Sequence, residues 1–119
     1  IEYRIVHALD GYDEISLTGD VKVVSPDREE ILSPQDFSYN AIDPIAISGG
    51  NTVEASAIIF LNVLQGKGTE AQKAVVISNS GLAIHASFPN KTKEECIDMA
   101  RKSLESGKAF EAFTKLLSI

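Results

Sequence analysis

The chain has 119 residues, of which 44% are apolar and 24% are charged, and its formal net charge is −6. This composition is that of an ordinary globular protein, so we assign residues 1–119 to a single domain. The negative charge argues against nucleic acid and anionic membranes as partners, and no stretch approaches the roughly 20 apolar residues of a membrane span. One cysteine, Cys96, allows no internal disulfide and fits a reducing, cytoplasmic location.

Short strands and turns are predicted for the first part of the chain. Residues 3–8 are rich in β-forming side chains, and Val21, Val23 and Ser25 alternate with their neighbours as residues of a half-buried strand do. A further short strand is expected near residue 31. Because only a few residues separate these segments, neighbouring strands are expected to pair antiparallel in a small meander.

Helical spacing replaces the strand pattern further along. A short helix or turn is expected to start at Ser33, with Pro34 in its first position. From Gly49 onward the apolar residues recur as on a helix, and the first long helix should begin at the N-cap Asn51 and end at Gly66. One face of this helix is expected to carry the apolar side chains of Val53, Ala57, Phe60, Leu61 and Leu64.

Two later helices begin with capping-box spacing, in which a threonine is followed three residues later by Gln or Glu. The first starts at Thr69 and runs over 69–86, and its apolar character predicts the most buried helix. The second starts at Thr92 and ends before Gly107, and a last helix covers 108–117. The whole pattern predicts an α/β domain in which about four C-terminal helices pack on a strand-rich N-terminal half.

The segment from His7 to Gly19, HALDGYDEISLTG, places Asp10, Asp13 and Glu14 within five positions. Asp-Gly is a common turn pair, so Asp10 has an ordinary explanation. Neighbouring carboxylates in a bend suit a hard cation such as Mg²⁺, which takes oxygen ligands and often only one or two of them from protein. The alternative is a solvated turn, because acidic pairs are common in turns.

Three other features have both a structural and a functional interpretation, and a fourth has a structural one alone. His7 is either a hydrogen-bonded structural residue or a catalytic one. Asn79, Ser80 and Gly81, in the middle of a predicted helix, reflect either close packing against a neighbour, with the polar groups bonded to backbone, or the lining of a site. The SGGN segment at 48–51 is either loop geometry or an anion-binding run of amides. Cys96 has no second thiol for a zinc site and is expected to be buried and inert.

Five segments, in one order and covering nearly the whole chain, resemble the C-terminal part of anthranilate phosphoribosyltransferase. They read VHALDGYDEISLTG, LSPQDF, ISGGN, VLQGKGTEAQKAVVISNSGLAI and SGKAFEAFTKLL. The resemblance is specific because five separate patches agree. It implies that the chain supplies part of a mixed sheet and the closing helices of a catalytic α/β domain.

The resemblance also implies a function. Enzymes of this family transfer a phosphoribosyl group from phosphoribosyl pyrophosphate to anthranilate in tryptophan biosynthesis and release pyrophosphate. The acidic pair of their DGxDE motif, here Asp13 and Glu14, binds the Mg²⁺ that accompanies the pyrophosphate. No catalytic nucleophile or base and no site for an organic cofactor is assigned to this segment. Ala8 stands where the family usually has glycine, a small departure that leaves the acids in place.

Other motifs of the family do not occur in the 119 residues. They are the GTGGD phosphate loop, the KHGN segment and the N-terminal helical domain that supplies anthranilate contacts and the dimer interface. The resemblance therefore implies a C-terminal fragment, which fits a start at Ile1 without methionine. We expect the isolated chain to be inactive, to self-associate through the strands at 3–8 and 21–25, and to belong to a homodimeric enzyme.

Two other interpretations stay open. The chain could be a binding or regulatory module that kept the fold and lost the chemistry, or a fragment of a pyrimidine nucleoside phosphorylase, which shares the architecture. The pair Asp13 and Glu14 and the SGGN segment favour the anthranilate enzyme. The reading frame upstream of Ile1 distinguishes an enzyme fragment from a separate module, because a GTGGD loop there indicates an enzyme and a nearby start codon indicates a separate module.

Overall fold

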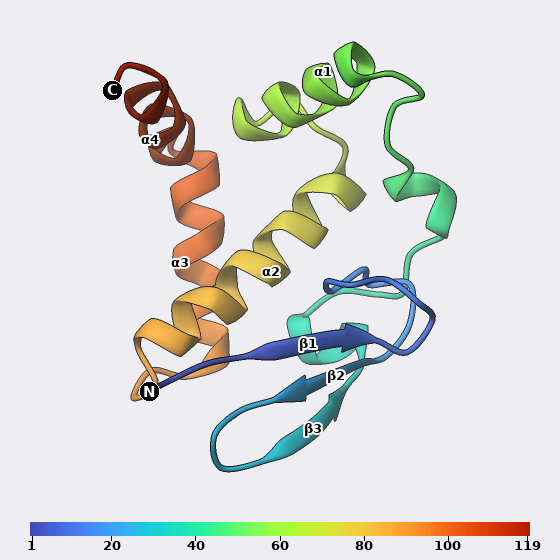
Figure 1. Ribbon diagram of the computed structural model, residues 1–119, viewed down its shortest axis with the longest axis vertical. Coiled ribbons are helices and arrows are strands. Elements are labelled where there is room, and N and C mark those ends of the chain that lie inside the picture. The colour runs from blue at the N-terminus through green and yellow to red at the C-terminus, as the bar shows by residue number, and fades with distance from the viewer.

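The N-terminal part of the chain forms a three-stranded antiparallel sheet in the computed structural model, which describes all 119 residues. Strands β1 (Ile5–Ala8), β2 (Val21–Val24) and β3 (Glu29–Leu32) lie in the order β1-β2-β3 (Figure 1). The predicted meander is therefore confirmed, and the part of the sheet present in this chain is antiparallel throughout.

Strand β2 is the central strand, and its side chains alternate as predicted. Val21 and Val23 are buried, whereas Lys22 turns outward and its Nζ lies 2.9 Å from Glu29 Oε2. The turn into β3 closes where the Ser25 N–H donates to the Arg28 carbonyl at 2.9 Å. The period-2 pattern thus assigns one face of β2 to the core.

Two short 3-10 turns and four α-helices follow the sheet, which confirms the α/β class and the number of helices. The elements are η1 (Pro34–Phe37), η2 (Pro44–Ile47), α1 (Val53–Leu64), α2 (Glu70–Ser87), α3 (Lys93–Glu105) and α4 (Lys108–Leu117). Capping boxes start α2 at Thr69 and α3 at Thr92, as predicted. The N-cap of α1 is Thr52, whose side chain accepts from Ala55 N–H, and not Asn51.

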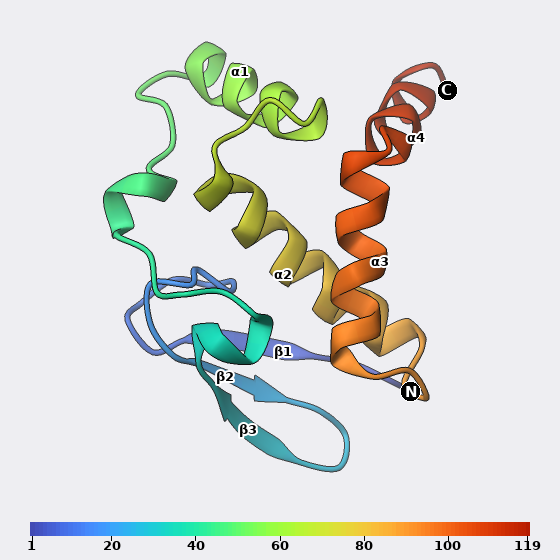
Figure 2. The ribbon, with the colours of Figure 1, turned by 180° about the vertical axis from the view of Figure 1, so that it is seen from behind.

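The hydrophobic core joins both halves of the chain. Twelve buried residues form it, drawn from the loop after β1, from β2, β3 and η1, and from α2 and α3. Figure 2 shows η1 in front of the sheet and beside the lower end of α3, where Lys93 Nζ lies 5.6 Å from the centre of the Phe37 ring. Phe37 of η1 is fully buried there, which explains why this short turn contributes to the core.

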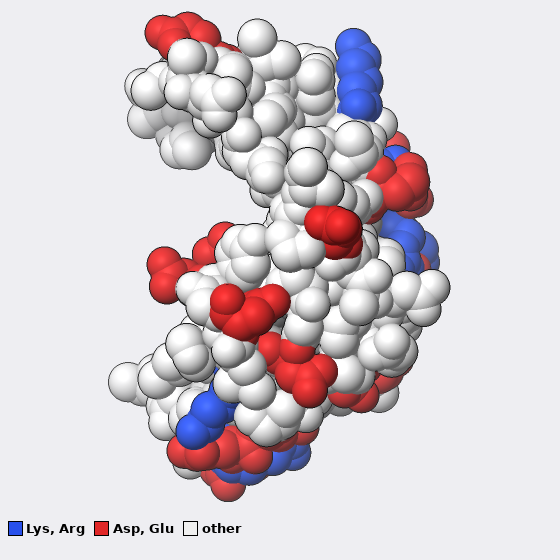
Figure 3. All heavy atoms as spheres, turned by 90° about the vertical axis from the view of Figure 1, so that its right-hand side faces the viewer, with Lys and Arg blue, Asp and Glu red and all other residues white.

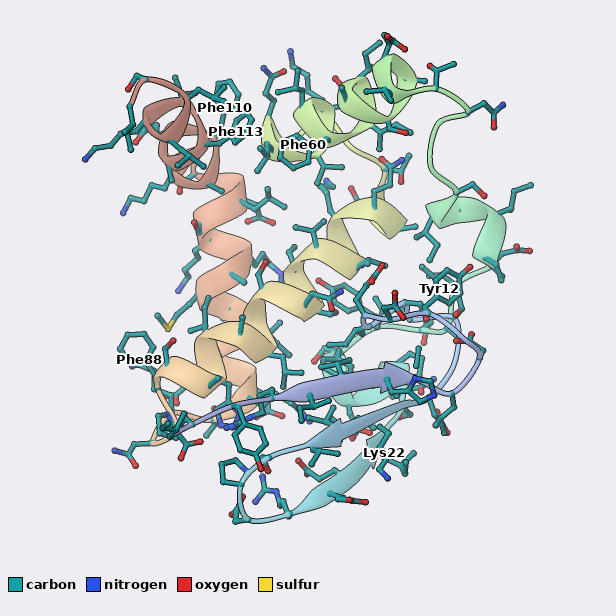
Figure 4. The ribbon with its side chains drawn as sticks, in the orientation of Figure 1. Tyr12, Lys22, Phe60, Phe88, Phe110 and Phe113 are labelled. Atoms are coloured by element: carbon teal, nitrogen blue, oxygen red, sulfur yellow. The ribbon has the colours of Figure 1, made fainter.

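Helix α1 exposes much of its apolar face, as expected of the helices beyond Gly49 in a chain that supplies only part of a domain. Val53 is 83% exposed and Phe60 is 50% exposed, and Val63 is the one buried residue of the helix. The predicted apolar stripe therefore faces solvent along most of α1. Phe60 meets Phe113 of α4 edge-on, with ring centroids 5.1 Å apart, and Figure 4 shows these rings gathered with Phe110 between the two helices.

Helix α2 approaches α3 closely at a glycine. A Cβ atom at Gly81 would lie 2.8 Å from Ile97 Cγ1 and 2.9 Å from Ile97 Cα, closer than real Cβ atoms approach. The side chain of Asn79 bonds to backbone groups in the same region. The packing interpretation of this polar stretch is therefore confirmed for Gly81 and Asn79. Ser78 is also buried, and its hydroxyl has no hydrogen-bond partner.

Substituting Gly81 with alanine should destabilise the fold, although alanine within a helix is more favourable than glycine by about 1 kcal/mol. The added methyl group must displace the backbone of Ile97, which predicts a loss of about 1–3 kcal/mol in the free energy of unfolding. Urea unfolding measures this loss. The control Ser80→Ala, at an exposed position of the same helix, should change stability by less than about 0.5 kcal/mol. Equal or greater stability of Gly81→Ala would contradict the close approach.

The isolated chain should self-associate through β1, an edge strand whose Ile5 is 60% exposed. The expectation for β2 was wrong, because both its edges are paired and Val23 is 1% exposed. Ile5→Lys should therefore lower the average mass in sedimentation across a concentration series. Ala83→Lys, which adds the same charge at an exposed position of α2, should not. A wild-type chain that stays monomeric at high concentration would refute this prediction.

Candidate metal-binding loop

The acidic segment forms the connection between β1 and β2. Leu9 N–H donates to the Asp20 carbonyl at 2.9 Å and so closes the base of the loop. Ala8 N–H donates to the Tyr12 carbonyl, and Gly11 N–H donates to the Ala8 carbonyl, each at 3.1 Å. Gly11 has φ +105°, a conformation that other residues rarely adopt, which explains the glycine in this turn.

The middle of the loop enters the hydrophobic core. Ile15 and Leu17 are each 1% exposed, and Ser16 between them is buried as well. Leu17 adopts a left-handed conformation with φ +60°, and its carbonyl accepts from Ile42 N–H at 2.9 Å. A surface connection of this length is ordinarily mobile. Here the buried side chains of Ile15 and Leu17 anchor it in the hydrophobic core.

Asn79 of α2 holds the same part of the loop from the other side. Its Oδ1 accepts from Ile15 N–H at 3.0 Å, and its Nδ2 donates to the Ile15 carbonyl at 2.8 Å. The second hydrogen of Nδ2 is donated to the Val75 carbonyl at 2.9 Å. Sequence reasoning left the role of Asn79 open, and these contacts assign it to the loop. In the sequence, the signal that could have indicated this role was an asparagine in the middle of a predicted helix.

The three acids of the segment have different environments. Asp10 accepts a hydrogen bond from the Thr18 hydroxyl, and the Ser16 hydroxyl lies 2.7 Å from the same Thr18 oxygen. Asp10 is thus part of the loop's internal bonding. Asp13 and Glu14 are exposed and form no hydrogen bond or ion pair. Their oxygens are consequently available to a ligand.

This donor set suits a cation that is completed by other ligands. The structure brings no three carboxylate, imidazole or thiol side chains together that could hold a metal ion by themselves. Two adjacent free carboxylates are the usual protein contribution to Mg²⁺, which retains waters and takes substrate phosphates as its remaining ligands. The residues present therefore fit shared coordination of Mg²⁺ and do not fit a closed protein cage.

The other candidate residues have structural surroundings of their own. His7 is exposed on β1 opposite Lys22 in the strand register. Cys96 is fully buried in α3, as predicted, and burial raises the pKa of its thiol. In the SGGN segment, a Cβ at Gly50 would lie 2.5 Å from Ala55 Cβ, so close packing explains that glycine.

The largest cavity of the molecule is also separate from the loop. It has a volume of about 300 Å³, and seven of its eleven lining residues, contributed by η2, α1 and α2 and the segment before α1, are apolar. It offers few polar groups that could orient a substrate.

Figure 3 shows a hollow in the surface, with acidic side chains on its lower lip. Tyr12 lies on the acidic loop beyond the end of β1 (Figure 4).

Comparison with known proteins now identifies the family. The sequence profile described as glycosyl transferase family, a/b domain, matches residues 2–110. The chain belongs to this family. The match covers the loop and all three strands, and it ends within α4.

Curated relatives confirm the resemblance to anthranilate phosphoribosyltransferase. The protein of that name from Cytophaga hutchinsonii is 50% identical over 114 residues, which are 96% of this chain and 35% of the relative. The one from Bacteroides fragilis is 48% identical over 117 residues, 98% of this chain and 35% of the relative. The chain thus spans about a third of the length of the curated relatives that it matches.

Solved structures show the same fold. Anthranilate phosphoribosyltransferase from Thermus thermophilus aligns with 98% of this chain and 35% of its own chain, at a TM-score of 0.88 and 24% identity. The enzyme from Saccharomyces cerevisiae in complex with PRPP and Mg aligns with 92% of this chain and 31% of its own, at a TM-score of 0.79 and 24% identity. In the present chain, no helix has the length and apolar character needed to cross a membrane.

The isolated chain is predicted to bind Mg²⁺ weakly or not at all. Two carboxylates without phosphate ligands leave most of the coordination shell to water, so a Kd of about 1 mM or weaker is expected. Isothermal titration calorimetry of the 119-residue chain measures it. Tight, saturable binding that disappears in Asp13→Asn would show instead that the loop is a complete metal site.

Proposed function

We propose that this chain is part of an anthranilate phosphoribosyltransferase and that Asp13 and Glu14 supply its Mg²⁺-binding loop. The observation that carries the proposal is a pair of unpaired, exposed carboxylates next to a buried and hydrogen-bonded anchor at Ile15. Identity of 50% to a curated enzyme of that name over 96% of the chain supports the reaction class. Residues 1–119 are proposed to be one part of its catalytic α/β domain.

The negative charge of the chain gives a reason for a bound cation at this loop. A net charge of −6 and exposed acids repel a phosphorylated substrate unless a cation lies between them. Mg²⁺ held at this position would neutralise the charge that develops on pyrophosphate as it leaves. Asp13 and Glu14 would bind and orient that cation through their free oxygens. Neither residue is assigned a role as nucleophile or base.

Substrates and partners follow from the same proposal. The yeast structures in complex with PRPP and Mg, and with 4-fluoroanthranilate, support phosphoribosyl pyrophosphate, Mg²⁺ and anthranilate as the ligands of the whole enzyme. A homodimeric, cytoplasmic enzyme stays part of the proposal. Inactivity of the isolated 119 residues stays a prediction, which rests on the phosphate loop that this sequence does not contain.

Removing both charges from the loop tests the proposed function. In the full-length gene product that contains this chain, Asp13→Asn with Glu14→Gln should lower kcat/KM for phosphoribosyl pyrophosphate by about 100-fold or more. The melting temperature should hardly change, because both side chains are exposed. Steady-state kinetics over a range of Mg²⁺ concentrations provide the measurement.

A matched control separates this effect from the loss of charge in general. Glu54→Gln with Glu111→Gln removes two exposed carboxylates from the first turns of α1 and α4. This control should retain activity within a few fold. Normal turnover of the Asp13→Asn, Glu14→Gln variant at saturating Mg²⁺ would exclude the assignment of the metal loop. Absence of the reaction in the unmodified gene product would exclude the enzyme itself.

A further inference from the structure

We propose that Asn79 is the positioning residue of the acidic loop, and that it holds in place the backbone from which Glu14 presents its carboxylate. This inference rests on the proposed function of Asp13 and Glu14 and extends it to a residue 64 positions away in the sequence. Asn79 lies on α2 and its amide oxygen already accepts from Ile15 N–H, so it is not assigned a part in binding the cation itself.

The argument begins with the peptide group that Asn79 holds. The N–H of Ile15 belongs to the peptide unit that joins Glu14 to Ile15, and it donates to Asn79 Oδ1 at 3.0 Å. The Cα atom of Glu14 lies in the plane of that peptide unit, so a hold on its N–H constrains where this Cα lies. The side chain of Glu14 leaves the backbone at this atom. A hydrogen bond to the Ile15 N–H therefore acts on the position from which the carboxylate is presented.

A second hydrogen bond from Asn79 restrains the rotation of the loop backbone at Ile15. Asn79 Nδ2 donates to the Ile15 carbonyl at 2.8 Å, so one amide grips both polar groups of one residue. A single hydrogen bond permits rotation about its axis, whereas two parallel bonds on one planar amide do not. Burial of Ile15, which is 1% exposed, keeps its side chain in the core but leaves its backbone N–H and carbonyl in need of partners. The amide of Asn79 supplies both partners.

The side chain of Asn79 can point in only one way. Its second Nδ2 hydrogen is donated to the Val75 carbonyl at 2.9 Å, so both hydrogens and the oxygen are in use. Exchanging the oxygen and nitrogen would place the amide oxygen against two carbonyl oxygens, which is unfavourable. Val75 lies one turn earlier on the same helix. The loop is therefore aligned to the rigid backbone of α2 through a fixed side chain.

Neighbouring contacts do not duplicate this role. The bonds among Asp10, Ser16 and Thr18 hold the side of the loop that returns to β2. The bonds of Ala8 and Gly11 hold the side that leaves β1. Between these two sides, no backbone hydrogen bond is formed by the N–H of Asp13 or Glu14. Asn79 is thus the nearest long-range contact that constrains the acidic pair.

Loss of the amide should reduce metal affinity without removing a metal ligand. Partners that orient metal ligands typically change metal affinity by about 10- to 100-fold when they are mutated. For Asn79→Ala in the full-length gene product, we expect the Mg²⁺ concentration for half-maximal activity to rise by about that factor. Excess Mg²⁺ should then restore kcat, because both carboxylates are still present.

The experiment combines three measurements. Hydrogen exchange by mass spectrometry follows the peptide that contains Ile15, and electron paramagnetic resonance measures Mn²⁺ binding in the presence of phosphoribosyl pyrophosphate. The third measurement is the Mg²⁺ dependence of the rate. Asn79→Ala should accelerate exchange at Ile15 and weaken Mn²⁺ binding about tenfold or more. The matched control Asn62→Ala removes an asparagine from α1 whose side chain forms no hydrogen bond, and it should change none of the three.

Each outcome decides one question. Faster exchange at Ile15 with unchanged Mn²⁺ affinity would overturn the positioning role and leave the metal loop intact. Normal Mn²⁺ binding by Asp13→Asn with Glu14→Gln would refute the proposed function instead. If Asn79→Ala does not fold, the unmodified protein still provides a test, because rapid exchange of Ile15 N–H would contradict the two-point contact. Rescue of Asn79→Ala by excess Mg²⁺, without rescue of the double variant, supports the proposal.

Discussion

The pairing of the Asn79 amide with both polar groups of Ile15 connects the two halves of this molecule. The acidic loop belongs to the sheet by sequence, and the helices contribute the side chain that fixes it. Ile15 and Leu17 add apolar anchorage in a core that also includes α2 and α3. This arrangement lets a loop with two unpaired carboxylates keep a defined shape, although like charges side by side would otherwise favour an open, solvated turn.

Local sequence patterns predicted the elements whose stabilisation is local. The threonine capping boxes gave the starts of α2 and α3, because each box satisfies backbone groups within one turn. The alternation of Val21 and Val23 identified the buried face of β2 for a similar reason. The acids Asp13 and Glu14 stood out by composition, and the resemblance to a known family, carried by five segments, gave them a chemical role that spacing alone did not.

Long-range packing decided what the sequence could not predict. The apolar stripe of α1 has helical spacing, but whether it faces the core depends on what lies beside it, and here Val53 is exposed. Asn79 was noticed as unusual within a helix, yet its partner Ile15 lies 64 residues away, a separation that no local pattern spans.

The contact at Gly81 has a mechanical consequence. Side chains between two helices usually act as a compliant layer, since they can change rotamer when one helix shifts. At Gly81 that layer is missing, and the backbone of α2 rests directly on Ile97 of α3. Any shift of α3 at Ile97 would therefore press on the backbone of α2 itself, two residues from the side chain that holds Ile15.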